Sequence, residues 1–377
     1  MRILLVNFCE FDEELGGVGV AVMQLANSFR ARKSSSAVVQ MGEKWRPQGV
    51  LPDQIPTWSI AVPSFPSIRR PRSWASFVRS ALQFRRILYA FKPDIVNVHF
   101  PLNQSLPVVA AASLPHRWRL VVTLHNSDIR LSPFLEPRLR IWQRRLMDCA
   151  DAVTAVSAAL LEDAIRLYPS IAKKGYVVYN GIEDRWFDSG PVASQESAKY
   201  VLSVGRLHEM KGLDILLRAW SKISSQLPTR QLWLVGEGPE ESNLRKLVQE
   251  LGISAPVRFL GKRNFAELIP LYRNAELFVL SSRREGFPFT LLEASACGTL
   301  CIAAGIPGIG ELIEDQVTGF LVAPENPEEL ASTMLRALQL DSEAKERIIE
   351  AAKRKVQEHF TEDRMAMGYL NLFGALK

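Results

Sequence analysis

The amino-acid sequence predicts an α/β protein made of two Rossmann-like domains, each built on a parallel sheet. Continuous Val/Ile/Leu runs alternate with amphipathic segments along the whole chain. Runs of this kind are typical of parallel strands that helices cover on both faces. The chain has 377 residues, of which 47% are hydrophobic and 23% charged, so each domain can bury a sizeable core.

The first half of the chain alternates strands and helices. Its apolar start is short and soon turns acidic, so a buried strand explains it better than a secretory signal. We expect strands at 2–8, 36–42, 94–100, 119–125, 152–157 and 175–181, and helices at 20–32, 74–91, 107–113 and 139–150.

A polar segment containing Gly and Pro, at 186–199, separates this half from a second alternation. We therefore predict an N-terminal domain at 1–184 and a C-terminal domain at 185–360. Strands are expected at 200–205, 231–236, 257–261, 277–282, 300–304 and 319–322, helices at 213–223, 241–251, 266–275 and 289–298, and helical structure throughout 327–377. The two sheets should face each other across a cleft, because such sheets bind ligands outside the carboxyl ends of their strands.

The net charge of +6 lies mainly in the first domain. The excess is concentrated in two arginine-rich stretches. These are Arg69, Arg70, Arg72, Arg79, Arg85 and Arg86, and then Arg130, Arg138, Arg140, Arg144 and Arg145. They could contact anionic lipid headgroups or an acidic acceptor, and the alternative is a solvated helix face. Nucleic acid is not an expected partner, because no recognition motif accompanies the charge.

Cysteine usage and hydropathy favour a cytoplasmic location, with the inner face of a membrane as a further option. Cys9, Cys149, Cys297 and Cys301 lack metal-binding spacing and form no disulfide framework, so we interpret them as buried thiols. No stretch approaches the length of a membrane span. No Asp-x-Asp motif follows a strand, so the sequence requires no metal or other cofactor.

The strongest local signal is the segment EGFPFTLLE, which follows a predicted buried strand and opens a helix. Glu285, in the loop, can accept hydrogen bonds from sugar hydroxyls. Gly286 and Pro288 shape a turn that leaves backbone N–H groups at the positive end of the helix, where phosphate oxygens or sugar hydroxyls bind. Glu293, one helical turn further on, could hold a ribose diol. The alternative is two surface glutamates at a helix start.

A second signal is SVGRLHEMKG, in which Arg206 and Lys211 follow a predicted strand end. A diphosphate leaving group gains negative charge as a glycosidic bond breaks, and fixed cations stabilise that charge where it forms. The placement therefore favours a phosphate clamp over an exposed pair of cations.

Weaker signals lie elsewhere. The segment LGGVG places Gly16, Gly17 and Gly19 ahead of a helix, where the backbone can approach an anion. His99 and His125 each end a predicted strand and could contact a sugar or acceptor, although isolated histidines are often structural. Gly236 begins the turn GEGPEE, expected near the nucleotide.

These segments resemble the retaining glycosyltransferases of family 4, which have the GT-B fold. The matching pieces are LGGVGVAVMQLANSF, DIVNVHF, VVTLHNSD, VLSVGRLHEMKGLDILLRAW, LVGEGPEESNLRKL, residues 257–298 and GELIEDQVTGFLV. Two departures from the family pattern stand out. RARKSSSAVVQ lacks a Gly-His pair that often follows the first helix, and Gln316 stands where Gly is usual, which puts the turn geometry in question.

The resemblance implies a role for each candidate residue. Arg206 and Lys211 would hold the donor diphosphate, Glu285 would face the donor sugar, and His125 would touch that sugar; these four form the expected catalytic set. The expected donor-binding residues are Gly17, Gly236, Gly286, Phe287, Pro288, Phe289, Thr290 and Glu293. The last helix, 361–377, would return to the first domain. The reaction would retain anomeric configuration without a metal, by a front-face route in which the departing phosphate helps to deprotonate the acceptor.

The expected function is transfer of a hexose or related sugar from a UDP- or GDP-sugar to a hydroxyl of a surface polysaccharide or glycolipid. One alternative is a catalytically silent scaffold that binds nucleotide-sugar, against which the complete set of Arg206, Lys211, Glu285 and Glu293 argues. Another is an isomerase resembling UDP-GlcNAc 2-epimerase. Such an enzyme would need additional acid/base carboxylates and histidines in the cleft, and the chain has only five histidines. A dehydrogenase is disfavoured, since no full GxGxxG is followed by an acidic residue at the expected distance.

Overall fold

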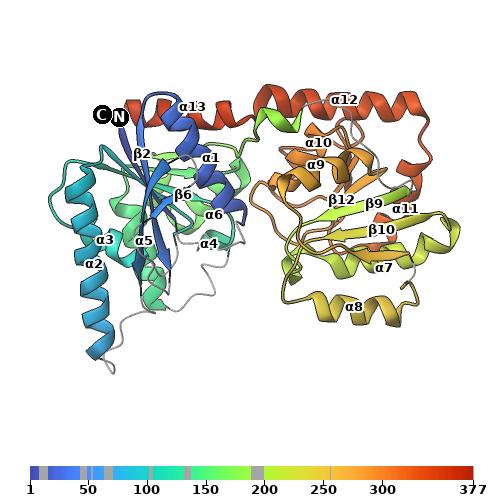
Figure 1. Ribbon diagram of the computed structural model, residues 1–377, viewed down its shortest axis with the longest axis horizontal. Helices are drawn as coiled ribbons and strands as arrows, with labels where there is room; N and C mark the ends of the chain where they lie inside the picture. The colour runs from blue at the N-terminus through green and yellow to red at the C-terminus, as the bar shows by residue number, and fades with distance from the viewer. Residues whose placement is uncertain are drawn as a thin grey trace. The chain divides into compact units, whose positions relative to one another are not determined.

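A computed structural model shows the architecture of the chain (Figure 1). It describes residues 1–7, 16–42, 49–51, 54–62, 71–101, 105–130, 137–187, 199–254 and 256–376. Arg69, Arg70 and Cys9 therefore lie outside the described residues, as does most of the polar segment at 186–199.

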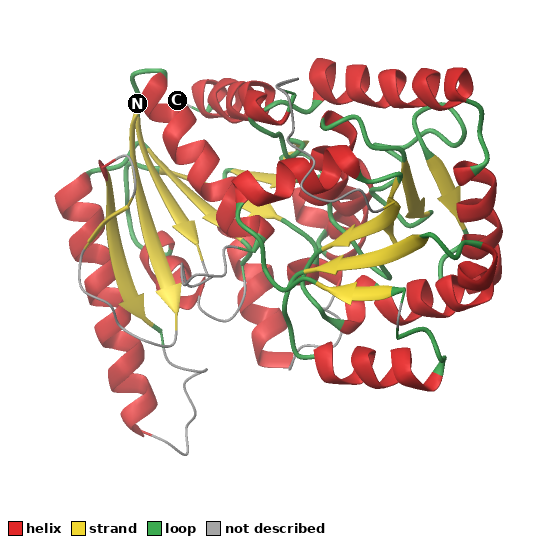
Figure 2. Ribbon diagram, turned by 45° about the vertical axis from the view of Figure 1, so that its right-hand side comes forward, coloured by secondary structure: helices red, strands yellow, loops and turns green. Residues whose placement is uncertain are grey.

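The chain forms two compact units. Unit 1 comprises Met1–Asn180 and Glu362–Lys377, and unit 2 comprises Gly181–Thr361. The last helix thus belongs to the unit that contains the N-terminus. Each unit is an α/β layer structure with helices around a central sheet (Figure 2).

Unit 1 contains the first eight strands in the described part of the chain. Its strands are β1 (Arg2–Asn7), β2 (Ser35–Gly42), β3 (Gly49–Leu51), β4 (Ile55–Ala61), β5 (Ile95–His99), β6 (Arg119–Leu124), β7 (Ala152–Ala155) and β8 (Gly175–Val177). Its helices are α1 (Gly17–Ala31), α2 (Pro71–Phe91), α3 (Leu106–Ala112), α4 (Ser127–Arg130), α5 (Pro137–Cys149), α6 (Ala158–Leu167) and α13 (Glu362–Ala375).

The sheet of unit 1 has the order β3-β4-β2-β1-β5-β6-β7-β8. Its pairs are parallel except the edge pair β3–β4. Both faces are covered, because Ile3 and Leu5 pack with α1 and α13 while the intervening Leu4 and Val6 are equally buried from the opposite face. The order reverses between β1 and β5, and an α/β sheet binds its ligands at the carboxyl ends of the strands beside such a reversal.

Helix α13 is fixed to unit 1 by an apolar face. Phe373 is fully buried and its ring lies 5.9 Å from that of Phe29 on α1. At the start of the helix, Glu362 accepts a hydrogen bond from Ser28, and Asp363 pairs with Arg32. Unit 1 is therefore completed by residues from the end of the chain.

Unit 2 contains a smaller parallel sheet of order β11-β10-β9-β12-β13-β14. The strands are β9 (Lys199–Val204), β10 (Arg230–Val235), β11 (Val257–Phe259), β12 (Leu277–Leu280), β13 (Cys301–Ala304) and β14 (Phe320–Val322). The helices are α7 (Leu213–Ile223), α8 (Glu241–Glu250), α9 (Phe265–Asn274), α10 (Phe289–Ala296), α11 (Pro327–Leu338) and α12 (Ser342–His359). Here the strand order reverses between β9 and β12.

Several expectations need correction. The stretch 327–360 is two helices, because Asp341 caps a new helix by accepting a hydrogen bond from the Ala344 amide at 2.7 Å. Strands β3 and β4 and helices α4 and α6 were not predicted. Cys149 is exposed at the end of α5, so only Cys301 of the described cysteines is a fully buried thiol.

The departure at Gln316 has a structural counterpart. This residue has a φ of 63°, in the left-handed region where Gly is favoured. Its amide donates to the carbonyl of Gly319 at 2.7 Å, which holds the turn before β14. The turn therefore forms, with a non-glycine residue in a conformation that glycine adopts more easily.

Among the described residues, no helix combines the length and apolar character that crossing a membrane would require.

Because Phe373 joins α13 to α1, Phe373→Ala should destabilise unit 1 by about 3–5 kcal/mol, the usual cost of truncating a buried aromatic side chain. Hydrogen exchange measured at equilibrium should show faster exchange in α13 and α1, with α7 of unit 2 unchanged. Met367→Ala is the control, because Met367 on the same helix is 42% exposed and its truncation should have little effect. Uniform acceleration in both units would contradict this assignment.

Candidate active site

The reversal of strand order in unit 2 brings two loops together. One follows β9 and carries Arg206 and Lys211; the other follows β12 and carries Glu285. Because β9 and β12 are adjacent and parallel, both loops leave the same edge of the sheet. The Ser281 hydroxyl donates to the carbonyl of Lys211 at 3.1 Å, so the loops are also joined directly.

Lys211 and Glu285 form an ion pair at this edge. Lys211 Nζ lies 2.6 Å from Glu285 Oε1, which also accepts a hydrogen bond from the Ser282 hydroxyl at 2.7 Å. The Glu285 side chain is 10% exposed and that of Lys211 25% exposed, so the pair lies at the rim of the fold. An ammonium group has three N–H donors and this contact uses one, so Lys211 can also bind an anion.

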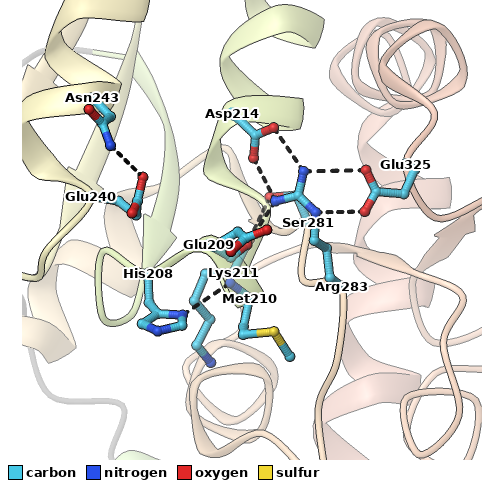
Figure 3. Close-up of polar contacts among 10 residues, drawn as sticks. All are labelled: His208, Glu209, Met210, Lys211, Asp214, Glu240, Asn243, Ser281, Arg283 and Glu325. Carbon is cyan, nitrogen blue, oxygen red and sulfur yellow. Dashed lines mark hydrogen bonds and ion pairs between the residues drawn. The ribbon is translucent and has the colours of Figure 1, made fainter. Parts of the chain in front are cut away.

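A neighbouring arginine holds both loops in place (Figure 3). Arg283 makes a bidentate contact with Asp214 at 2.8 Å for both bonds, and it also pairs with Glu325 at 2.6 Å. It donates to the carbonyl of Glu209, and its backbone amide donates to that of Met210. Hydrogen bonding to Asp214 raises the pKa of Arg283, and the same contact lowers the pKa of Asp214 against the effect of its burial.

The loop after β10 approaches the loop after β9 closely enough to require glycine. At Gly236, φ is 134° and a Cβ atom would lie 1.9 Å from the carbonyl oxygen of Gly205. The Leu207 amide donates to the carbonyl of Glu237, so a backbone hydrogen bond joins the two loops next to Arg206. The Arg206 side chain is exposed, and among the described residues no hydrogen bond links it to Glu285.

Helix α10 begins immediately after Pro288, so the amides of Phe289 and Thr290 lie in its first turn. Phe287 and Pro288 are buried, and the Phe287 ring packs 5.0 Å from that of Phe360. Thr290 Oγ1 is buried and has no hydrogen-bond partner within the described part of the chain. A helix N-terminus with an additional hydroxyl suits phosphate or sugar oxygens.

Glu293 extends this helix face and contacts a buried tyrosine. The Tyr272 hydroxyl donates to Glu293 Oε2 at 2.8 Å. Burial raises the pKa of Glu293 to about 7, and the hydrogen bond from Tyr272 opposes that shift. The carboxyl group therefore changes charge near neutral pH.

In unit 1, Gly17 begins α1, with Gly16 as an extended N-cap residue and no acidic side chain in the first turn. His125 follows β6 and is buried. Its ring nitrogen Nε2 lies 3.1 Å from Nδ1 of His99, at the end of the neighbouring strand β5. Burial lowers the pKa of His125 to about 3 and holds that of His99 well below its usual value.

Asp128 on α4 holds the turn that carries His125. Its carboxylate accepts the backbone amide of His125 at 3.0 Å and that of Asn126 at 2.7 Å. Burial raises the pKa of Asp128 to about 6, although these amide bonds oppose the shift. The described residues include no cluster of three or more His, Cys, Asp or Glu side chains able to hold a metal ion.

The structure joins Lys211 to Glu285, and it places His125 in a separate group in unit 1. Sequence reasoning missed three side chains that support these groups: Arg283, Tyr272 and Asn97. Arg283 had a partial signal, because it lies two residues before the EGFPFTLLE segment. The other two lie within a predicted helix and strand and resemble ordinary core positions.

Two α/β units, each built on a largely parallel sheet, are the architecture of the GT-B fold. Residues 184–355 match the model described as "Glycosyl transferases group 1", and residues 15–186 match "Glycosyltransferase Family 4". The two matches overlap at 184–186 and together span residues 15–355, so the chain belongs to glycosyltransferase family 4. It is a retaining glycosyltransferase that uses a nucleotide-sugar donor.

Known proteins of similar sequence or fold match this chain over nearly its full length. N-acetyl-alpha-D-glucosaminyl L-malate synthase of Bacillus anthracis is 28% identical, with 95% of this chain and 94% of the relative covered. Sucrose-phosphate synthase from Thermosynechococcus elongatus has a TM-score of 0.81 at 21% identity, with 100% and 98% covered. The Anabaena protein HepE in complex with UDP-glucose has a TM-score of 0.79 at 22% identity, with 100% of each chain covered.

The raised pKa of Glu293 predicts a pH-dependent stability of unit 2. In the unfolded chain the carboxyl loses its proton near its ordinary value of 4.5, but in the folded protein it does so near 7. The folded state therefore binds more protons between these values, and its stability should fall as pH rises through this window. We expect a loss of about 1–2 kcal/mol between pH 5 and 8, because Glu293 is only partly shielded from water.

Chemical denaturation of the wild-type chain and the Glu293→Gln variant would measure this effect. The difference in unfolding free energy between the two should change with pH in the stated direction. Tyr272→Phe removes the hydrogen bond that favours the charged carboxylate, so it should extend the wild-type loss to higher pH. Parallel pH profiles for wild type and Glu293→Gln would contradict the prediction.

Proposed function

We propose that unit 2 binds the donor through the loops after β9 and β12. Arg206 and Lys211 hold the diphosphate, and Glu293 accepts hydrogen bonds from the ribose. Glu285 and the amides of Gly286–Thr290 face the donor sugar, with Gly236 shaping the nucleotide side. The observation that carries this proposal is the 2.6 Å contact between Lys211 and Glu285, which puts a cation for phosphate beside an acceptor for sugar hydroxyls.

Unit 1 contributes two further groups to this proposal. The backbone at Gly17 approaches the diphosphate, because the start of α1 favours an anion and glycine leaves the amide accessible. His125 contacts the donor sugar. Both assignments follow the family resemblance and the position of these residues at the carboxyl edge of the sheet.

The proposed reaction transfers a hexose from a UDP-linked sugar to a hydroxyl of a surface polysaccharide or glycolipid, in the cytoplasm. The relative whose structure contains UDP-glucose favours uridine over guanosine as the donor base. As the glycosidic bond breaks, Arg206 and Lys211 stabilise the charge that develops on the diphosphate. The departing phosphate helps to deprotonate the acceptor on the same face of the sugar. We propose that these cations do the work of a metal ion.

The donor assignment is tested by thermal shift with UDP, GDP, ADP and dTDP and their sugars, followed by turnover in the presence of EDTA. A nucleotide at 100 times its dissociation constant should add about 2.7 kcal/mol of stability. Lys211→Ala should lower kcat by about 100- to 1000-fold, the usual cost of losing a group that stabilises developing charge. Its melting temperature without ligand should stay close to that of the wild type.

Lys222→Ala is the matched control for Lys211→Ala. Lys222 forms an exposed ion pair with Glu328 on the outside of unit 2, so its loss should leave turnover unchanged. Normal turnover in Lys211→Ala would remove the phosphate clamp from the proposal. Loss of turnover in EDTA, restored by a divalent cation, would remove metal independence.

We further propose that the outer face of α2 contacts an anionic membrane at which the acceptor is presented. Trp74, Val78 and Leu82 repeat every four residues along this face and are 44–52% exposed, with Tyr89 following at 81%. Arg79, Arg85 and Arg86 are exposed on the same helix, and α2 contains no acidic residue. Apolar side chains flanked by arginines match the chemistry of a headgroup layer with negative charge.

Vesicle flotation tests the membrane contact. The full chain should bind vesicles of phosphatidylcholine with phosphatidylglycerol more strongly than phosphatidylcholine alone. Each Arg→Gln change at 79, 85 or 86 should weaken binding about fivefold, and Leu82→Ser should weaken it on both lipid mixtures. Tyr176→Ser, an exposed change on β8 at the other end of the sheet, should bind as the wild type does. Equal binding by all variants would refute the assignment to α2.

A further inference from the structure

A buried chain of hydrogen bonds leads to His125 from the interior of unit 1. The Thr123 hydroxyl donates to Asn97 Oδ1 at 2.9 Å, Asn97 Nδ2 lies 3.0 Å from His99 Nε2, and His99 Nδ1 lies 3.1 Å from His125 Nε2. The Tyr369 hydroxyl of α13 donates to Thr123 at 3.3 Å. Asn97, His99 and Thr123 are fully buried.

The donors and acceptors along this chain set the protonation of both rings. Because Asn97 uses its oxygen to accept from Thr123, it presents its amide N–H to His99 Nε2, which must then be an acceptor. Burial keeps His99 neutral, so its proton is on Nδ1 and is donated to His125 Nε2. The remaining proton of a neutral His125 is therefore on Nδ1.

The backbone after His99 is held in an unusual conformation. Phe100 has a φ of 56°, although it is not glycine, and its amide donates to the carbonyl of Thr123 at 3.0 Å. A non-glycine residue in the left-handed region persists only where its surroundings enforce it. The β5 terminus that carries His99 is thus fixed by backbone as well as side-chain contacts.

We propose that His99 is a positioning residue, which together with Asn97 locks His125 as a hydrogen-bond donor from Nδ1 to an oxygen of the donor sugar. The inference rests on the proposed contact between His125 and that sugar, and adds the direction of the hydrogen bond and the residues that impose it. His99 itself acts only through His125. A neutral donor of fixed orientation needs no rearrangement when the sugar binds.

Nitrogen-15 NMR of histidine-labelled full-length protein without ligand tests the lock directly, since the two neutral tautomers have distinct spectra. Wild-type His125 should be protonated on Nδ1. His99→Phe keeps an aromatic ring at this position but removes the donor, so His125 should shift towards protonation on Nε2. His99→Asn places an amide N–H where Nδ1 stood, so it should retain the wild-type tautomer. A wild-type His125 protonated on Nε2 would overturn the inference whether or not the enzyme is active.

Turnover tests the consequence for catalysis. His99→Phe should lower kcat/KM for the donor by about 10- to 100-fold, as expected when one buried hydrogen bond is lost, and His99→Asn should recover most of it. The thermal shift produced by UDP should persist in both variants, because unit 2 is unchanged. Ser36→Ala, which removes another buried hydroxyl bond of the same sheet, should leave tautomer and turnover unaltered. Equal turnover in wild type and His99→Phe would overturn the role in orienting the sugar.

Discussion

The candidate site in unit 2 depends on one contact, the ion pair between Lys211 and Glu285. It exists because the strand order reverses between β9 and β12, so the loops after two adjacent strands leave the same edge of the sheet. Neither side chain could hold this geometry alone at a partly exposed rim. Arg283, in the loop after β12, supplies the missing rigidity by binding Asp214 and the carbonyl of Glu209 in the segment after β9, and it also pairs with Glu325. Gly236 lets the loop after β10 pack against the loop after β9.

In unit 1, buried hydrogen bonds orient the polar side chains. Its polar side chains lie inside the sheet, where each buried donor needs an acceptor and the low polarity keeps the histidine rings neutral. In unit 2 the important groups are charged and near solvent; in unit 1 they are neutral, linked and buried. Under the proposed function, the charged groups suit the phosphates of a nucleotide-sugar and the neutral groups suit the hydroxyls of its sugar.

Much of this architecture could be predicted from the sequence, because buried runs mark strands and the residues after them mark one edge of a sheet. The placement of Lys211 and Glu285 at strand ends followed in that way. The contact between His99 and His125 could not be predicted, since it depends on the register that pairs His99 with Thr123 across β5 and β6. Register and strand order arise from packing between distant segments. The position of Arg283 beside EGFPFTLLE was visible, but its partners were not, because Asp214 and Glu325 are far from it along the chain.

The last helix gives the chain an unusual order of assembly. Residues 181–361 form a complete unit, whereas the preceding unit lacks α13 until Glu362–Ala375 have been made. During synthesis on the ribosome, the later segment can therefore finish folding before the earlier one. Until then Phe29 lacks its aromatic partner and Thr123 lacks the hydroxyl of Tyr369. Unit 1 is therefore begun first and completed last. Both its apolar core and its buried histidine chain depend on residues of α13.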